Sequence, residues 1–277
     1  MRKLILGTGM GLPLSIEEQI PLIKRAGFNG LFLDCCDAQK IASYANLARA
    51  EGLLVQSVHA PFGHVNLMWE GTDEEAEGEI AAQIQCLEAC ARAEIPLVVM
   101  HAYIGFERHD PTELGAVRYD RLYTAAERLG VKIAMENTEG EEYLEYLFRA
   151  FPDRKSVGFC IDTGHEMCYN ESRDLIGKYG YRLFSTHLND NLRRTGDVIT
   201  WHDDSHLLPF DGKGDWEGIA RRLHLAGYEG PLTFELTTKN KPNRSTHDIY
   251  AHLSPSEYLT LAHAHAVRFG ELFDSLS

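Results

Sequence analysis

The 277-residue sequence contains no apolar run near the roughly 20 residues that a membrane-spanning helix needs. The first residues, MRKLILGTGMGLP, also lack the longer apolar stretch and the small-residue cleavage site of a secretory signal. We therefore expect a cytoplasmic protein. Cysteine is scarce too, and its spacing fits neither a disulfide framework nor a zinc finger, so we expect reduced thiols. The cysteines are Cys35, Cys36, Cys86, Cys90, Cys160 and Cys168.

Basic residues are outnumbered: 27 Lys and Arg face 41 Asp and Glu, which gives a formal net charge of −14 at pH 7. Nucleic-acid binding depends on Lys and Arg contacts with phosphates, and no basic stripe stands out, so nucleic acid is not an expected partner. The sequence also lacks internal repeats and any linker rich in Pro, Gly or Ser. A single domain over residues 1–277 is the prediction, and a homo-oligomer stays possible.

Short apolar segments alternate with longer amphipathic ones, as in parallel strands covered by helices. The predicted strands lie at 3–7, 30–34, 54–59, 97–101, 131–136, 157–162, 183–188 and 232–236. Eight such strands predict an α/β protein with a single (β/α)8 TIM barrel. Ser15 and Glu18 have capping-box spacing at the start of the first helix, and the longest helices are expected at 73–95 and 255–275. The connections 189–214 and 237–254 are long enough to carry function.

Six of the predicted strands end, or nearly end, on a residue that can bind a metal ion. Because a parallel barrel brings the carboxyl ends of its strands to one mouth, these residues are expected to converge there. They are His59, His101, Glu136, Asp162, His187 and Glu235.

The last four of these residues form the predicted primary metal site: Glu136, Asp162, His187 and Glu235. Three carboxylates and one imidazole suit Mn²⁺, Mg²⁺ or Co²⁺ as well as Zn²⁺. Burying three like charges near one axis would be prohibitive without a compensating cation. We therefore expect one divalent ion at this position.

Three segments, GFCIDTGH, HLNDN and DSHLLPFDGKGDW, carry a resemblance that extends over the whole chain. The sequence resembles the xylose isomerase-like TIM barrel superfamily, which includes sugar and sugar-phosphate isomerases and epimerases and the endonuclease IV family. In the ketose 3-epimerases of this superfamily, a Glu, Asp, His, Glu quartet holds one divalent ion. It matches Glu136, Asp162, His187 and Glu235 in the same order.

The resemblance to the epimerases implies metal-dependent isomerisation or epimerisation of a sugar or sugar phosphate. In such a reaction the ion stabilises an enediolate, while Glu136 and Glu235 remove and return the proton from opposite faces. His165 and Arg193 match the substrate-contacting His and Arg of those enzymes. His59 and His101 are further candidates for substrate binding.

An endonuclease IV-like hydrolase is the alternative, because the nine-ligand pattern for three zinc ions is complete in this sequence. It adds His59, His101, His165, Asp204 and His206 to the primary four. Such a site would cleave phosphoesters with a zinc-generated hydroxide. The acidic charge and the N-terminal sequence depart from that family, which puts DNA repair in doubt. A carbohydrate-binding sensor without catalysis is a third possibility.

Several other residues have less specific patterns. Phe62, Trp69 and Trp201 fit either a wall against a sugar or ordinary packing. His224 and His247 are predicted to lie on the surface. Basic residues after the last strand, Lys239, Lys241 and Arg244, fit either an anion site or a solvated charge run. The long loops contain no readable code for the substrate.

Overall fold

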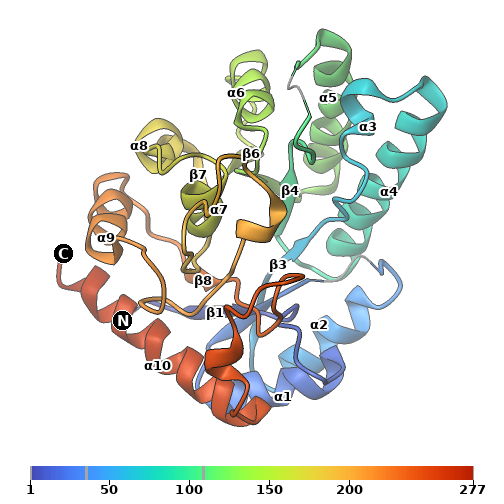
Figure 1. The fold of residues 1–277 in the computed structure, drawn as a ribbon. Helices are drawn as coiled ribbons and strands as arrows, with labels where there is room; N and C mark the ends of the chain where they lie inside the picture. Colours follow the sequence, from blue (N-terminus) through green and yellow to red (C-terminus); the bar gives the residue numbers. More distant parts are fainter. Residues whose placement is uncertain (1, 35–36, 108–109, 277) are drawn as a thin grey trace.

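In the computed structural model, which describes residues 2–34, 37–107 and 110–276, a sheet of eight strands occupies the centre (Figure 1). Neighbouring strands pair in parallel, in the order β7-β6-β5-β4-β3-β2-β1-β8. The two edges meet where Leu188 bridges to Phe234, so the barrel is nearly closed. The strands are β1 (Leu4–Gly7), β2 (Gly30–Leu33), β3 (Leu54–His59), β4 (Leu97–His101), β5 (Lys132–Glu136), β6 (Val157–Asp162), β7 (Leu183–His187) and β8 (Leu232–Phe234).

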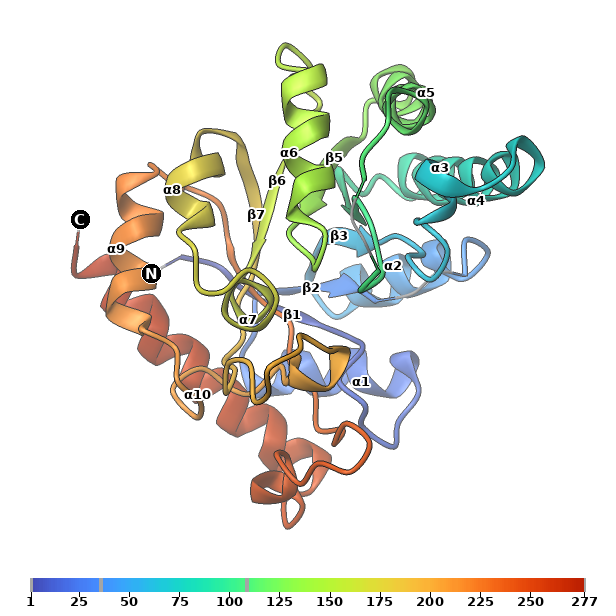
Figure 2. The same cartoon turned by 45° about the horizontal axis from the view of Figure 1, so that its top comes forward.

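Helices surround these strands (Figures 1 and 2), which confirms the predicted (β/α)8 TIM barrel. The α-helices are α1 (Ile16–Ala26), α2 (Ile41–Ala50), α3 (Leu67–Glu70), α4 (Asp73–Arg92), α5 (Glu113–Leu129), α6 (Glu141–Ala150), α7 (Thr163–Cys168), α8 (Leu175–Tyr179), α9 (Trp216–Leu225) and α10 (Pro255–Asp274). Short 3₁₀ turns are η1 (Gly180–Arg182), η2 (Trp201–Asp203) and η3 (Asp248–Tyr250). The two longest helices, α4 and α10, end within a few residues of their predicted limits.

Local sequence signals explain where helix α1 begins and ends. Ser15 and Glu18 form the predicted capping box: Ser15 Oγ accepts from the Glu18 amide at 3.3 Å, and Glu18 Oε2 accepts from the Ser15 amide at 2.8 Å. Two backbone N–H groups that a helix start would leave unpaired are thereby satisfied. The helix stops at Gly27, whose φ of 110° is the left-handed conformation that glycine adopts without steric cost.

The core lies between the strands and the surrounding helices, where aliphatic and aromatic side chains are fully buried. The barrel interior also holds polar groups that bond to one another. Thr233 Oγ1 donates to Gln56 Oε1 at 2.6 Å, and Gln56 Nε2 donates to Ser185 Oγ at 3.4 Å. These bonds satisfy buried polar atoms that would otherwise cost free energy.

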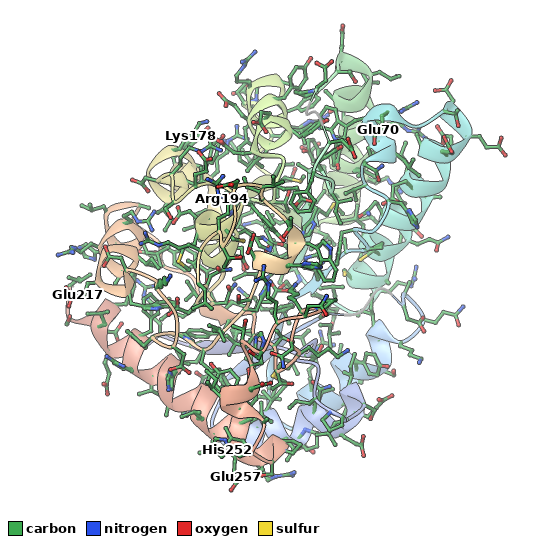
Figure 3. The ribbon with its side chains drawn as sticks, viewed as in Figure 1. Glu70, Lys178, Arg194, Glu217, His252 and Glu257 are labelled. Carbon is green, nitrogen blue, oxygen red and sulfur yellow. The ribbon has the colours of Figure 1, made fainter. Side chains whose placement is uncertain are left out.

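The outer surface is polar, and charged residues such as Lys178, Glu217 and Glu257 project from the outer helices (Figure 3). No helix in the described part of the chain is long and apolar enough to cross a membrane. The cysteines that the structure describes, Cys86, Cys90, Cys160 and Cys168, are buried free thiols. Cys35 and Cys36 lie outside the described residues. The single-domain assignment stays a prediction.

The two long connections after β7 and β8 lie against each other over the barrel mouth (Figure 2). Lys241 Nζ lies 3.2 Å from Asp204 Oδ2, and Arg244 Nη2 donates to Thr195 Oγ1 at 2.9 Å. Arg244 also lies 3.6 Å from the buried carboxylate of Asp203. These contacts hold the loop of η2 in a defined position beside the strand ends.

Candidate metal centre

The carboxyl ends of β3 to β7 each carry one of the predicted metal ligands, and all five are buried. Parallel pairing sets His101 beside Glu136 and Asp162 beside His187. Glu235 directly follows β8, and 21% of its side chain is exposed. The structure thus brings the six predicted strand-end residues to one mouth: His59, His101, Glu136, Asp162, His187 and Glu235.

Glu136 lies at the centre of this group and is fully buried. Its Oε2 atom faces two imidazoles, with His59 Nε2 at 3.2 Å and His101 Nε2 at 3.3 Å. Its Oε1 atom faces a third imidazole, with His187 Nδ1 at 3.0 Å. The two oxygens of one carboxylate therefore point to two different sets of nitrogen ligands.

The four predicted primary ligands form one cluster. One ligand atom from each of Glu136, Asp162, His187 and Glu235 lies within 4.8 Å of the others. His187 Nδ1 lies 2.9 Å from Glu235 Oε2, so this nitrogen faces two carboxylates at once. Such a spacing allows four side chains to surround one cation after small side-chain adjustments.

A second set of predicted ligands lies between α7 and the η2 loop. Asp204 Oδ1 is 2.9 Å from His206 Nε2 and 3.6 Å from His165 Nε2. Asp204 follows η2 directly, and His206 has a positive φ of 48°. The structure therefore gathers His165, Asp204 and His206 beside the primary cluster, as the nine-ligand pattern requires.

Backbone carbonyls fix the tautomer of three imidazoles. His59 Nδ1 is 2.8 Å from the Ala60 carbonyl, and His165 Nδ1 is 2.9 Å from the Asn137 carbonyl. His206 Nδ1 is 3.1 Å from the Glu235 carbonyl. A carbonyl only accepts, so each Nδ1 carries the hydrogen and each Nε2 faces the carboxylates. Metal-binding histidines are commonly oriented in this way.

The carboxylates and imidazoles strongly shift one another's pKa. Burial opposes a charge on His59, but the hydrogen bond to Glu136 prevails and raises the His59 pKa to about 9. Burial likewise opposes the charge on His206, yet Asp204 raises its pKa to about 9. Burial would raise the pKa of Glu235, but His187 lowers it to about 2. Burial dominates at Asp162 and raises its pKa to about 6, against the attraction of His165.

These shifts reflect charge compensation within the cluster. Buried carboxylates need compensating positive charge, and the neighbouring imidazoles supply it by retaining protons. A divalent cation could replace those protons at the same positions, because the oxygen and nitrogen donors already converge. Imidazole and carboxylate donors are ligands that Zn²⁺ and Mn²⁺ accept. The residues present therefore fit a divalent metal ion.

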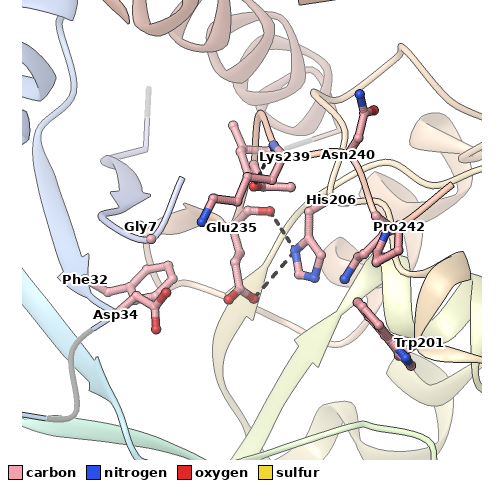
Figure 4. Close-up of a pocket in the computed structure, with 13 residues that line it drawn as sticks. Gly7, Phe32, Asp34, Trp201, His206, Glu235, Lys239, Asn240 and Pro242 are labelled. Atoms are coloured by element: carbon pink, nitrogen blue, oxygen red, sulfur yellow. Dashed lines mark hydrogen bonds and ion pairs between the residues drawn. The ribbon is translucent and has the colours of Figure 1, made fainter. Parts of the chain in front are cut away.

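Two adjacent cavities open above the cluster. The aromatic lobe, of about 450 Å³, is lined by His59, His101, His165 and Asp204 and by the rings of Phe62, Phe106 and Tyr169. The lysine lobe, of about 400 Å³, is lined by Gly7, Phe32, Asp34, Thr237 and Lys239, among others (Figure 4). Four residues line both lobes: Trp201, His206, Glu235 and Lys241. Glu235 thus faces the cavities, whereas Glu136 lies beneath the imidazoles.

Arg193 is exposed and does not line either lobe. Its backbone has a φ of 64°, and its amide donates to Asn191 Oδ1 at 2.8 Å. Its predicted contact with substrate stays a prediction. Phe62 and Trp201 line the cavities, but Trp69 is a core residue whose indole donates to the Ala102 carbonyl at 2.7 Å.

His247 is buried, so its predicted surface position is wrong. Its Nε2 donates to the Ser205 carbonyl at 2.7 Å and thereby supports the loop between Asp204 and His206. His224 is exposed, as predicted. The interpretation failed for His247 because an irregular loop has no periodicity that would reveal its buried side.

Asp34 is the main site residue that the sequence interpretation missed, whereas Lys241 was named only as part of a basic cluster. Asp34 directly follows β2 and lines the lysine lobe, so the strand-end rule that identified the other acids could have found it. Lys241 pairs with Asp204, a contact between two long loops that no local pattern predicts. Asn189 was missed as well: its Nδ2 donates to Asp162 Oδ2 at 2.7 Å and orients that carboxylate.

Comparison with known proteins supports this assignment of the fold. A family model described as "Xylose isomerase-like TIM barrel" matches residues 20–254. The chain is 30% identical over 202 residues to the uncharacterized protein y4fM of Sinorhizobium fredii, covering 68% of this chain and 59% of that protein. It is 28% identical over 154 residues to "Probable endonuclease 4" of Chloroflexus aurantiacus, covering 47% and 53%. The chain thus spans little more than half the length of these relatives.

Solved structures with the same fold include sugar epimerases. The 3-keto-D-glucoside 4-epimerase YcjR of E. coli has a TM-score of 0.72 at 17% identity, covering 97% of this chain and 100% of that one. D-psicose 3-epimerase of Clostridium cellulolyticum, solved with D-tagatose, has a TM-score of 0.72 at 16% identity and 99% coverage of both chains. The IolI protein, solved with a zinc atom, has a TM-score of 0.74 at 18% identity, covering 96% and 97%. At these identities the likeness shows the fold alone.

Proposed function

Because the chain belongs to the xylose isomerase-like TIM barrel family, we propose that it is a divalent-metal-dependent isomerase or epimerase of a sugar or sugar phosphate. The proposal rests mainly on one observation. Glu136, Asp162, His187 and Glu235 cluster directly below a cavity that Glu235 itself lines. The sugar epimerases that share this fold support the same class of chemistry.

A bound divalent ion would supply Lewis-acid polarisation of a substrate carbonyl, which makes the neighbouring C–H bond more acidic. We infer that Glu235 takes up that proton, because its carboxylate faces both lobes and, although burial would raise its pKa, His187 lowers it to about 2, so that the group is ionised. Glu136 is the second predicted acid–base group. It is fully buried, so a substrate would reach it only past His59 and His101.

The remaining cavity residues are suited to orienting a polyhydroxylated molecule. If one ion is bound, the imidazoles of His59, His101 and His165, which line the aromatic lobe, would contact substrate oxygens. Phe62 and Trp201 are 38% and 48% exposed, so part of each ring is available to contact the apolar face of a sugar. Pockets with a few directed polar groups among aromatic side chains are typical of small-molecule sites.

The test is solvent-deuterium incorporation into a panel of ketoses and their phosphates, with Mn²⁺- or Co²⁺-loaded protein. We expect exchange of one carbon-bound hydrogen in at least one sugar, with loss of that exchange in Glu235→Gln. Glu217→Gln is the matched control, because Glu217 is an exposed acid on α9 outside the site. A folded, metal-loaded protein that exchanges no sugar in the panel would contradict the proposal.

A multinuclear zinc phosphoester hydrolase is the second candidate, favoured by one specific arrangement. The two oxygens of Glu136 face separate imidazole sets, as a carboxylate between two metal ions would. His165, Asp204 and His206 add a third set, and the similarity to "Probable endonuclease 4" points the same way.

Metal analysis separates the two candidates. One ion per chain supports the isomerase, whereas three zinc ions together with cleavage of an abasic-site duplex or a phosphomonoester support the hydrolase. We place the isomerase first because the net charge of −14 opposes a nucleic-acid substrate and the cavity walls are aromatic.

A further inference from the structure

The lysine lobe extends the cavity away from the metal cluster, toward β1, β2 and the segment 237–242. We infer that this lobe binds an anionic group of the substrate, a phosphate or a carboxylate, through Lys239. The inference deepens the proposed function, since it names the substrate class as a sugar that carries an anionic group.

The segment that ends in Lys239 is held in place by hydrogen bonds from its backbone amides. The Thr237 amide donates to the His206 carbonyl at 3.1 Å, and the Thr238 amide donates to the Met10 carbonyl at 2.9 Å. The Lys239 amide donates to Thr237 Oγ1 at 3.2 Å. A segment fixed in this way can present a side chain to a ligand without a large ordering cost.

Gly11 leaves room for the Lys239 side chain. Gly11 has a φ of 67°, and a Cβ atom added to it would lie 2.6 Å from Lys239 Cγ. The aliphatic part of Lys239 therefore lies across the loop after β1. Figure 4 shows this side chain reaching over the lobe beside Glu235.

The charges around the lobe distinguish Lys239 from the neighbouring basic residues. Arg244 pairs with Asp203 outside the cavity, and Lys241 pairs with Asp204. Among the described residues, Lys239 has no ion pair within 4.0 Å. Asp34 lines the same lobe, and its carboxylate would repel an anion and confine it to the Lys239 side. Lys239 is thus an exposed cation at the edge of the lobe with no ion pair among the described residues, in a lobe that Asp34 and Glu235 also line.

The position of the lobe fits a substrate that reaches beyond the reacting carbons. Glu235 and His206 line both lobes, so a sugar centred on Glu235 has one end in each. The lobe of about 400 Å³ lies within the range of about 300–1,000 Å³ that is usual for small-molecule sites. A terminal phosphate or carboxylate would extend the sugar toward Lys239.

The experiment titrates inorganic phosphate, and separately acetate, into metal-loaded protein at fixed ionic strength, with binding heat as the readout. We expect saturable phosphate binding that Lys239→Gln weakens about tenfold, the scale of one charge-assisted hydrogen bond. Lys213→Gln is the matched control: Lys213 is an exposed lysine of the other long loop that does not line the lobe. The Lys213→Gln protein should bind phosphate with a dissociation constant within about twofold of that of the unsubstituted protein. The metal content should be equal in the unsubstituted protein and the two variants.

Phosphate affinity unaffected by Lys239→Gln would overturn the inference, because phosphate would then bind at the metal alone. Absence of saturable binding of either anion would overturn it too. Lys239-dependent binding of acetate but not phosphate would support the anion site and identify the group as a carboxylate. Phosphate binding is measured without turnover, so it is independent of the sugar-exchange assay. A protein that exchanges no sugar hydrogen can still show Lys239-dependent phosphate binding, and a protein that exchanges sugar hydrogens can lack it.

Discussion

Replacement of Glu136 by Gln is expected to abolish metal binding and the stability that depends on it. Glu136 is fully buried and lies 3.0–3.3 Å from three imidazole nitrogens, so no other side chain can take its place. The change removes one negative charge but keeps nearly the same volume. Its effect should therefore come from lost ligation rather than from a cavity.

The size of the effect follows from ligand-linked stability. An ion present at about 100 times its dissociation constant stabilises the native state by about 2.7 kcal/mol. For a chain of this size, about 1 kcal/mol corresponds to roughly 2–4 °C in Tm, so a chelator should lower the Tm of the unsubstituted protein by about 5–10 °C. We expect Glu136→Gln to show a chelator shift below about 2 °C, because it holds little metal.

Thermal unfolding with and without chelator, together with metal analysis of the purified proteins, measures this directly. Glu217→Gln should behave like the unsubstituted protein, since it makes the same chemical change on the surface. If Glu136→Gln kept full metal content and the same chelator shift, the assignment of Glu136 as a ligand would be refuted.

Two further predictions concern pH and the residues that hold the ligands. Without metal, the raised pKa of His59 and His206, about 9 against an ordinary 6.5, stabilises the fold below pH 6.5, and this stability is lost as the pH rises toward 9. With metal, affinity should instead increase over the same range, because the ion competes with those protons. Tm profiles of chelated and metal-loaded protein that changed in parallel with pH would argue against this. Asn189→Ala should weaken metal binding about 10- to 100-fold, since its amide orients Asp162; competition with a chelating dye measures this, and an unchanged dissociation constant would count against that role.

The barrel could be predicted because most strands are short and largely apolar, and longer helices such as α1, α6 and α9 are amphipathic. Residues such as Val98, Ile133 and Ile161 are fully buried within their strands, so short runs of apolar residues indicate where the strands lie in the sequence. The strand-end rule identified the candidate metal ligands that cluster at the mouth for the same reason, since parallel strands end at one face. Glu235 lies one residue beyond β8 rather than within it, and this small error did not move it away from the mouth.

The contacts within the long loops could not be predicted, because they form between residues far apart in the sequence. His247 is buried through a bond to Ser205, and Lys241 reaches Asp204 from a separate loop. Neither contact has a local pattern in the sequence. Asp34 is different, because it is the last residue of the predicted strand 30–34. The strand-end rule that was applied to the other strands would have included it.

The most direct test of the metal centre is anomalous scattering from crystals of Mn²⁺-loaded protein. We predict a peak between Glu136, Asp162, His187 and Glu235. Additional peaks beside His59 and His101 and beside His165 and His206 would favour the multinuclear hydrolase. Absence of a peak at the four primary residues, in protein that binds Mn²⁺ in solution, would contradict the account.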